Sequence, residues 1–167
     1  MPGKTKVAVY TLLLTATCFF APTASADSVS VKGGPAIVNG SPSGATKYFG
    51  VRGETDLGIS LMALEAGAFG DNTGNGQHSS LVGKAQLGIN PGQRVGLFGK
   101  AFLGPCVIST PDTLLGGRFP QFATDVGVGF RDKDTFMVFG YSHISSAGIV
   151  RPNKGRDFLT FEAGVQF

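Results

Sequence analysis

A histidine, a serine and an aspartate near the carboxyl end of the chain have the residue types of a hydrolytic triad. His143 and Ser145 lie two residues apart in the segment Thr135–Ser145, and Asp157 lies near the start of residues 156–167. Alternate side chains of a strand share one face, so His143 and Ser145 would point the same way. In such a group the serine attacks an acyl carbon, the histidine takes its proton, and the carboxylate orients the imidazole.

The faces that carry these three residues are otherwise largely apolar. Met137, Phe139 and Tyr141 share the face of His143, and the face of Asp157 also carries Leu159, Phe161, Ala163, Val165 and Phe167. If these faces meet lipid, polar groups on them are costly and a function is the expected reason for them. Whether the three residues have a function therefore depends on the fold of the segments that carry them.

The amino-terminal residues have the order of a secretory signal peptide. Lys4 and Lys6 precede an apolar run over residues 7–20, and Ala24-Ser25-Ala26 offers a small-residue cleavage site. We expect residues 1–26 to be a signal peptide that is cleaved after Ala26. Residues 27–167 then form one domain.

Charge and cysteine content exclude several classes of function. Subtracting Lys4 and Lys6 from the 14 basic residues leaves 12 against 11 acidic ones, which does not indicate nucleic-acid binding. Cys106 is the only cysteine after the signal, so an internal disulfide is impossible, and we expect a small buried or loop residue rather than a nucleophile. With one such cysteine and two histidines, neither a metal site nor a cofactor is expected.

The sequence pattern favours strands over helices. Glycine is abundant, with 26 residues, apolar residues alternate with polar or small ones, and no run after the signal has the 18 apolar residues of a spanning helix. Strands are predicted at about 28–33, 46–52, 57–70, 79–89, 94–108, 119–131, 135–145 and 156–167. Short connections are expected at 53–56, 90–93 and 132–134, and long ones at 34–45, 71–78, 109–118 and 146–155.

An even strand number with alternating short and long connections predicts an all-β fold, the eight-stranded antiparallel transmembrane β-barrel of outer-membrane type. The third strand alternates poorly around Ile59 and Leu61, which suggests a bulge. The lumen is predicted to be plugged by side chains of both signs that pair with one another: Lys84, Lys100, Asp125, Glu162 and Glu65.

In this topology the triad residues lie at the outer rim of the barrel. His143 and Ser145 come at the outer end of the seventh strand and Asp157 at the outer start of the eighth, so a register that pairs His143 with Asp157 makes them direct neighbours. The terminal Phe167, preceded by apolar residues at every second position, resembles the carboxyl-terminal signature of bacterial outer-membrane barrels. Insertion by the barrel-assembly machinery is therefore expected.

The loop between the two strands carries three cations, Arg151, Lys154 and Arg156. At the level of lipid head groups they could bind the phosphates of an anionic lipid. An ordinary solvated loop is the other interpretation.

Residues 143–149 and 152–157 resemble the active-site motif of the outer-membrane lipid A 3-O-deacylase family. The resemblance implies an eight-stranded barrel that removes an ester-linked acyl chain from lipopolysaccharide. It implies His143 as base, Ser145 as nucleophile and Asp157 as the acidic residue, where the family often has glutamate. It also implies an oxyanion hole near the backbone N–H of Gly148 and a supporting role for Asn153.

One residue departs from the family pattern. Members usually carry asparagine directly after the nucleophile as an oxyanion donor, and this chain has Ser146. Loss of such a donor costs on the order of 3 kcal/mol in transition-state stabilisation. We expect Ser146 to supply a weaker donor.

The sequence leaves three functions open. The favoured one is a serine esterase of the bacterial outer membrane, which takes lipid A as its substrate in the outer leaflet. Its other expected partners are the lipids of that membrane and a second copy of the chain in a homodimer. A non-catalytic barrel, structural or adhesive, requires His143 and Ser145 to lie in the lumen or too far apart to bond. An acyltransferase with a similar nucleophile is the third.

Overall fold

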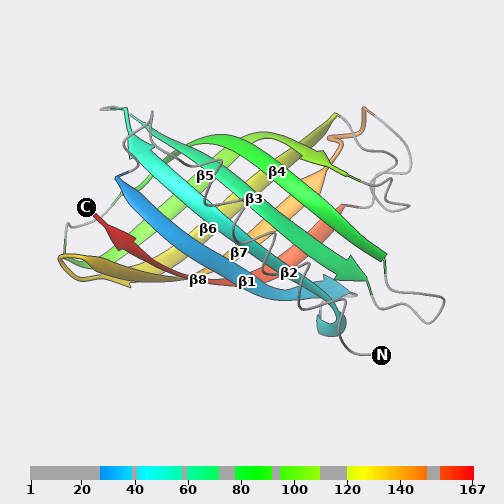
Figure 1. The fold of residues 1–167 in the computed structure, drawn as a ribbon, viewed down its shortest axis with the longest axis horizontal. Helices are drawn as coiled ribbons and strands as arrows, with labels where there is room; N and C mark the ends of the chain where they lie inside the picture. Colours follow the sequence, from blue (N-terminus) through cyan, green and yellow to red (C-terminus); the bar gives the residue numbers. More distant parts are fainter. Residues whose placement is uncertain are drawn as a thin grey trace, which may run out of the picture.

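The structure is an eight-stranded antiparallel sheet closed into a barrel (Figure 1). It is a computed structural model that describes residues 27–38, 41–57, 60–71, 78–91, 95–109, 120–149 and 155–167. The strands are β1 (Ser28–Val38), β2 (Ser41–Asp56), β3 (Leu61–Asp71), β4 (His78–Ile89), β5 (Gly96–Ile108), β6 (Gln121–Arg131), β7 (Thr135–Ser145) and β8 (Arg156–Gln166). The described residues include no helix of sufficient length and apolarity to cross a membrane.

Closure of the barrel confirms the predicted fold class. Each strand pairs with the next, and β8 pairs back to β1 through contacts such as Lys32 with Glu162. Closure leaves no unpaired sheet edge. The predicted signal peptide, residues 1–26, lies outside the described residues and stays a prediction.

The connection between β1 and β2 differs from the prediction. A long loop was expected at 34–45, whereas β1 continues to Val38 and β2 begins at Ser41, so the expected strict alternation of short and long connections is wrong. The glycine, proline and serine residues that suggested a loop are accommodated by a register shift between Pro35 and Ala36. Such an irregularity lets a strand contain a proline such as Pro35, which has no backbone N–H to donate to the neighbouring strand.

Within its described residues, Leu61–Asp71, the third strand contains no bulge. β3 begins at Leu61, and the N–H of Leu57 donates to the carbonyl of Ser60 in a turn. The register with β2 is unbroken from Thr46–Asp71 to Asp56–Leu61. Leu57 and Ser60, which the predicted strand includes, lie outside β3; residues 58 and 59 lie outside the described residues.

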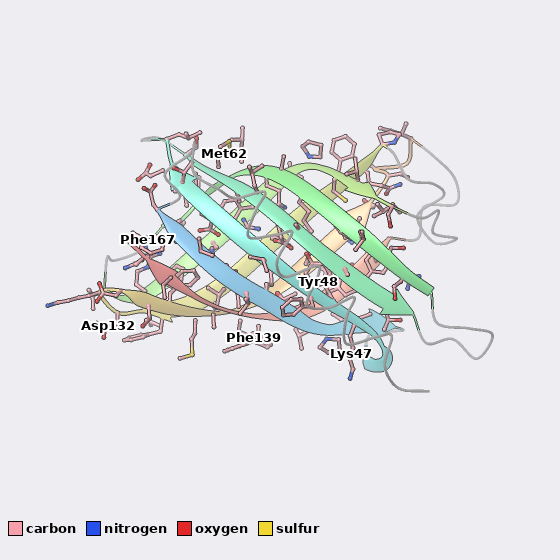
Figure 2. The ribbon with its side chains drawn as sticks, in the orientation of Figure 1. Lys47, Tyr48, Met62, Asp132, Phe139 and Phe167 are labelled. Carbon is pink, nitrogen blue, oxygen red and sulfur yellow. The ribbon has the colours of Figure 1, made fainter. Side chains whose placement is uncertain are left out.

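The outward face of the barrel is apolar along most of its length. Figure 2 shows Phe139 projecting from the wall. The exposed side chains include Val31, Leu64, Leu81, Leu87, Leu97, Leu103, Val126, Val128, Met137, Phe139 and Phe161. A continuous apolar belt of this extent fits lipid rather than water.

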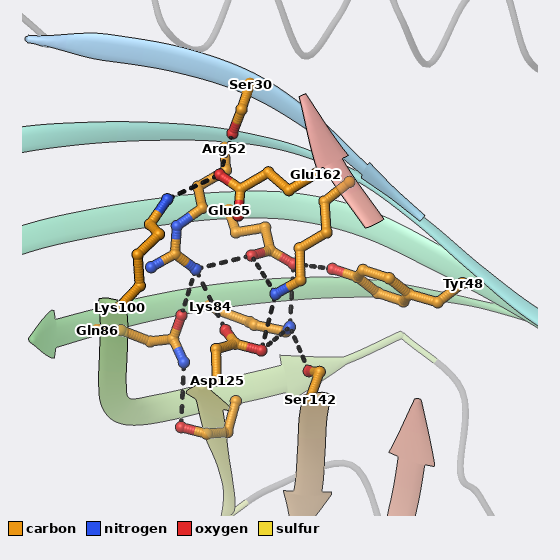
Figure 3. A network of polar contacts seen from close by, with 12 residues as sticks. Ser30, Tyr48, Arg52, Glu65, Lys84, Gln86, Lys100, Asp125, Ser142 and Glu162 are labelled. Atoms are coloured by element: carbon orange, nitrogen blue, oxygen red, sulfur yellow. Dashed lines mark hydrogen bonds and ion pairs between the residues drawn. The ribbon is translucent and has the colours of Figure 1, made fainter. Parts of the chain in front are cut away.

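The lumen is filled by a charged network (Figure 3). Lys84 Nζ lies 2.9 Å from Glu65, Lys32 Nζ 2.7 Å from Asp125, and Lys100 Nζ 2.9 Å from Glu162. The network residues are Lys32, Arg52, Lys84, Lys100, Glu54, Glu65, Asp125 and Glu162, all buried. Four cations face four carboxylates among the described residues, which confirms the predicted pairing of both signs inside the barrel.

Apolar layers close the lumen on either side of this network. At the end where β7 finishes and β8 begins, the Phe158 ring packs 5.3 Å from Tyr48 and 5.9 Å from Phe69, with Ile144 and Cys106 in the same cluster. Cys106 is therefore buried, as expected. Because Ile144 and Phe158 directly follow His143 and Asp157, the wall that carries the triad residues is anchored on a packed interior.

Candidate active site

The register of β7 with β8 places His143 directly opposite Asp157, as expected. Alternation sends His143 and Ser145 outward, whereas Ser142 and Ile144 are fully buried on the lumen side. The non-catalytic alternative requires the histidine and serine to lie in the lumen or too far apart to bond. Their outward placement excludes the first of these two arrangements.

His143 and Asp157 form the central contact of the site. Nδ1 of His143 lies 2.6 Å from Oδ1 of Asp157, and the two side chains are 35% and 34% exposed. A carboxylate facing Nδ1 assigns the proton to that nitrogen, which leaves Nε2 as the acceptor. This is the tautomer that a general base needs to take a proton from a hydroxyl.

Ser145 is the last residue of β7 and lies half-buried on the same outward face. Two residues of strand separate its Cα from that of His143 by about 7 Å. No hydrogen bond joins Ser145 Oγ to the imidazole in the part of the chain that the structure describes. The structure thus brings His143 and Asp157 together and leaves Ser145 nearby but unbonded to His143.

Tyr141 also reaches the carboxylate, which the sequence analysis missed. Its hydroxyl donates to Oδ1 of Asp157 at 2.5 Å. Tyr141 pairs with Leu159, so it lies diagonal to Asp157 across the two strands. An aromatic side chain can reach such a diagonal neighbour. The contact could therefore have been predicted, because a register that pairs His143 with Asp157 places Tyr141 diagonal to Asp157.

Gly155 closes one side of the imidazole. It is buried, has φ of 73°, and a Cβ placed on it would lie 2.6 Å from Cε1 of His143. The ring therefore packs against bare backbone. Any side chain at this position would push the imidazole away, and most would also be strained at that φ.

A tight turn follows Ser145. The N–H of Ile149 donates to the carbonyl of Ser146 at 3.0 Å, and both central residues have positive φ, 51° for Ala147 and 81° for Gly148. A left-handed alanine costs about 1 to 2 kcal/mol and marks a backbone held by its surroundings. Within the described residues, the N–H groups of Ala147 and Gly148 have no backbone partner, so both can donate to an oxyanion.

Of the other predicted site residues, Ser146 and Arg156 do not direct their side chains to the outward face. The side chain of Ser146 is fully buried, and that of Arg156 is buried with its guanidinium 5.6 Å from the Phe69 ring. Arg156 thus points to the lumen, opposite to Asp157. Arg151, Asn153 and Lys154 lie outside the described residues.

The described residues also hold no group of three or more histidine, cysteine or acidic side chains that could bind a metal ion.

Comparisons with known proteins indicate the family of the chain. Residues 44–166 match the model of a protein family described as lipid A 3-O-deacylase (PagL). No curated protein matches. A solved structure titled "Crystal structure of the outer membrane enzyme PagL" is similar with a TM-score of 0.63 and 18% identity, over 84% of this chain and 99% of that one. Because the family model spans most of the barrel, including both strands that carry the outward histidine, serine and aspartate, the chain belongs to the lipid A 3-O-deacylase family of ester hydrolases.

Proposed function

We propose that the deacylase activity of this family is carried here by Ser145 as nucleophile, His143 as general base and Asp157 as the group that orients the imidazole. The observation that supports the assignment is the 2.6 Å contact between His143 Nδ1 and Asp157 Oδ1 on the outward wall. The described lipid-facing positions around it are mostly apolar. The buried charged groups of the lumen neutralise one another, whereas the pair on the outward wall has no such structural role.

The first half of the reaction is acyl transfer to the enzyme. Rotation of the Ser145 side chain brings Oγ to Nε2 of His143, a contact that often tightens only when substrate binds. As Oγ attacks the ester carbonyl carbon, Nε2 takes its proton, and the N–H groups of Ala147 and Gly148 donate to the oxyanion. Collapse of this intermediate breaks the ester bond, and His143 returns the proton to the departing sugar oxygen.

The second half releases the fatty acid. Water attacks the acyl-serine while Nε2 takes a proton from it. Collapse of the second intermediate breaks the bond between the acyl carbon and Oγ, His143 returns the proton to Oγ, and the carboxylic acid is released. Through both halves Asp157 accepts the hydrogen bond from Nδ1–H and stabilises the imidazolium.

The position of the site defines how the substrate arrives. The triad residues lie at the barrel end opposite to Phe167, on the outward face, and the lumen behind them is filled. We place this end in the outer leaflet of the bacterial outer membrane, so lipid A reaches Ser145 laterally from the leaflet. Arg151, Lys154 and Asn153 stay predicted contacts for the head group or the loop, and insertion by the barrel-assembly machinery and dimer formation stay predictions.

The test compares two serines of the same strand. Ser145 faces out, and Ser142 faces the lumen, where its hydroxyl contacts Lys84 at 3.2 Å. Purified Ser145→Ala protein should release no 3-O-linked fatty acid from lipid A, as measured by mass spectrometry of both products, while Ser142→Ala protein should retain the activity. Equal deacylation by wild type and Ser145→Ala would exclude Ser145 as the nucleophile. Appearance of the acyl chain on another lipid instead of as free acid would indicate acyl transfer.

A further inference from the structure

We infer that Tyr141 is a positioning residue of the reaction, which holds the Asp157 carboxylate against the imidazole of His143. The inference rests on the proposed function, because it assigns a supporting role around the same triad. Nothing in the family resemblance assigns a role to this tyrosine.

The geometry around one carboxylate oxygen carries the inference. Oδ1 of Asp157 accepts from the Tyr141 hydroxyl at 2.5 Å and contacts His143 Nδ1 at 2.6 Å. Both partners come from β7 and the carboxylate comes from β8. Asp157 is thus fixed between two side chains of the neighbouring strand, and it cannot rotate away from the histidine without also breaking its bond to the tyrosine.

The surroundings explain why Asp157 needs a second partner. Its side chain is about one-third exposed on a wall that faces lipid, where few polar groups can hold it in place. The tyrosine has the reciprocal need, because a hydroxyl facing hydrocarbon is costly unless it is hydrogen-bonded. Each group therefore satisfies the other.

An ordinary interfacial tyrosine is the competing interpretation. Tyrosines of the aromatic belts of membrane proteins sit at the head-group level with an amphipathic ring at the interface. Tyr141 instead directs its hydroxyl to the carboxylate that contacts the imidazole. A belt residue should tolerate loss of its hydroxyl without an effect on catalysis.

The expected effect falls on the chemical step. Hydrogen bonds to an ionised carboxylate are stronger than neutral ones and keep it oriented toward the imidazolium that forms during the reaction. An interaction that matters mainly in the transition state lowers kcat and leaves KM nearly unchanged. Purified full-length Tyr141→Phe protein should therefore lose about tenfold in kcat on lipid A in mixed micelles.

The matched control is Phe139→Leu. Phe139 is an exposed aromatic residue of the same strand and face, and its partner across the strands is Phe161 rather than Asp157. This variant should keep the kcat of wild type. A heat-modifiability gel of each variant checks that the barrel is folded.

Two further readouts separate positioning from a general structural effect. In an Asp157→Asn background, Tyr141→Phe should cause no additional loss of rate, because the two residues act through one contact. The chain has two histidines, so 15N-histidine spectra in micelles contain two imidazole signals, and His78→Asn assigns them. The Nδ1–H signal of His143 should move on Tyr141→Phe and stay unchanged on Phe139→Leu.

The outcomes distinguish this inference from the proposed function. Wild-type kcat in Tyr141→Phe, together with an inactive Ser145→Ala, would overturn the role of Tyr141 and leave the triad standing. Full activity in Ser145→Ala would overturn the proposed function itself. A loss in Tyr141→Phe that Phe139→Leu reproduces would also overturn the positioning role, since it would show a general effect of the aromatic wall.

Discussion

The barrel holds two polar clusters that obey different physical rules. Inside, among the described residues, a network of four cations and four carboxylates is buried and cross-linked, as with Arg52, which contacts Glu54, Glu65 and Asp125. Outside, one imidazole and one carboxylate share a single contact and are about one-third exposed. The inner cluster is explained by mutual neutralisation. The outer cluster is not part of such a neutralised network, and the proposed function explains it by chemistry on lipid.

One strand supplies both clusters. Along β7, Tyr141, His143 and Ser145 face out, while Ser142 and Ile144 face the lumen. Neighbouring residues of the same strand are therefore matched probes. Substitutions on the outward positions should change the reaction, and substitutions on the inward positions should change the stability of the barrel.

The largest effect is expected for His143→Gln. This variant keeps a polar side chain of similar size but has no base for the Ser145 hydroxyl, so the rate should fall by about 10⁴-fold. The barrel should stay folded because the lumen is unaltered. Initial rates of fatty-acid release measure this, and a rate within tenfold of wild type would contradict a role as general base.

The next largest effect should appear in the lumen and leave the reaction intact. Glu65 contacts Lys32, Arg52 and Lys84, and removal of one member of a buried ionic group costs about 3 to 5 kcal/mol. Glu65→Ala should lower the free energy of unfolding by that amount in a urea titration of the protein in lipid vesicles. The kcat of the folded fraction should match wild type. An unchanged free energy of unfolding with a reduced kcat would contradict the assignment of stability to the lumen cluster and of catalysis to the outward cluster.

Gly155→Ala should impair the reaction with a smaller effect than loss of the base. The added methyl would displace the imidazole, and a misplacement of about 1 Å in a catalytic group can cost about 10²-fold in rate. The control is Gly70→Ala, where the nearest atom to the added Cβ is Ser79 Oγ at 3.7 Å. Equal kcat values for the two variants would show that the imidazole has room to adjust.

The smallest expected effect belongs to Ser142→Ala. Loss of its contact with Lys84 should lower the free energy of unfolding by about 1 kcal/mol and leave kcat unchanged. Urea titration beside the activity assay checks both. A loss of activity without a loss of stability would mean that the lumen side of β7 takes part in the reaction.

Much of the fold was predictable because the alternation of side chains is strong in this chain. The outward apolar set and the inward Lys84, Asp125 and Glu162 were readable as period-two patterns. The register that joins His143 to Asp157 was also predictable, since both flank one connection. The proposed roles of His143, Ser145 and Asp157 follow from the chemistry of their side chains and from the family resemblance.

The missed features depend on geometry that sequence spacing does not encode. Lys32 lies within the first predicted strand but was not recognised as a lumen residue, and Glu54 was assigned to a turn because β2 was predicted too short. Tyr141 and Gly155 contact the site through a diagonal side-chain reach and a ring packed on backbone. Such contacts follow from rotamers and local φ rather than from residue pattern.

Covalent trapping of the nucleophile tests the central claim most directly. Wild-type protein in vesicles that contain lipid A is treated with a long-chain alkyl fluorophosphonate, and the modified residue is located by peptide mass spectrometry. The outward triad predicts a single phosphonylated residue, Ser145, with deacylation lost in proportion and no labelling in His143→Gln protein. Labelling of Ser142 or Ser146 instead, or inhibition without modification of Ser145, would contradict it.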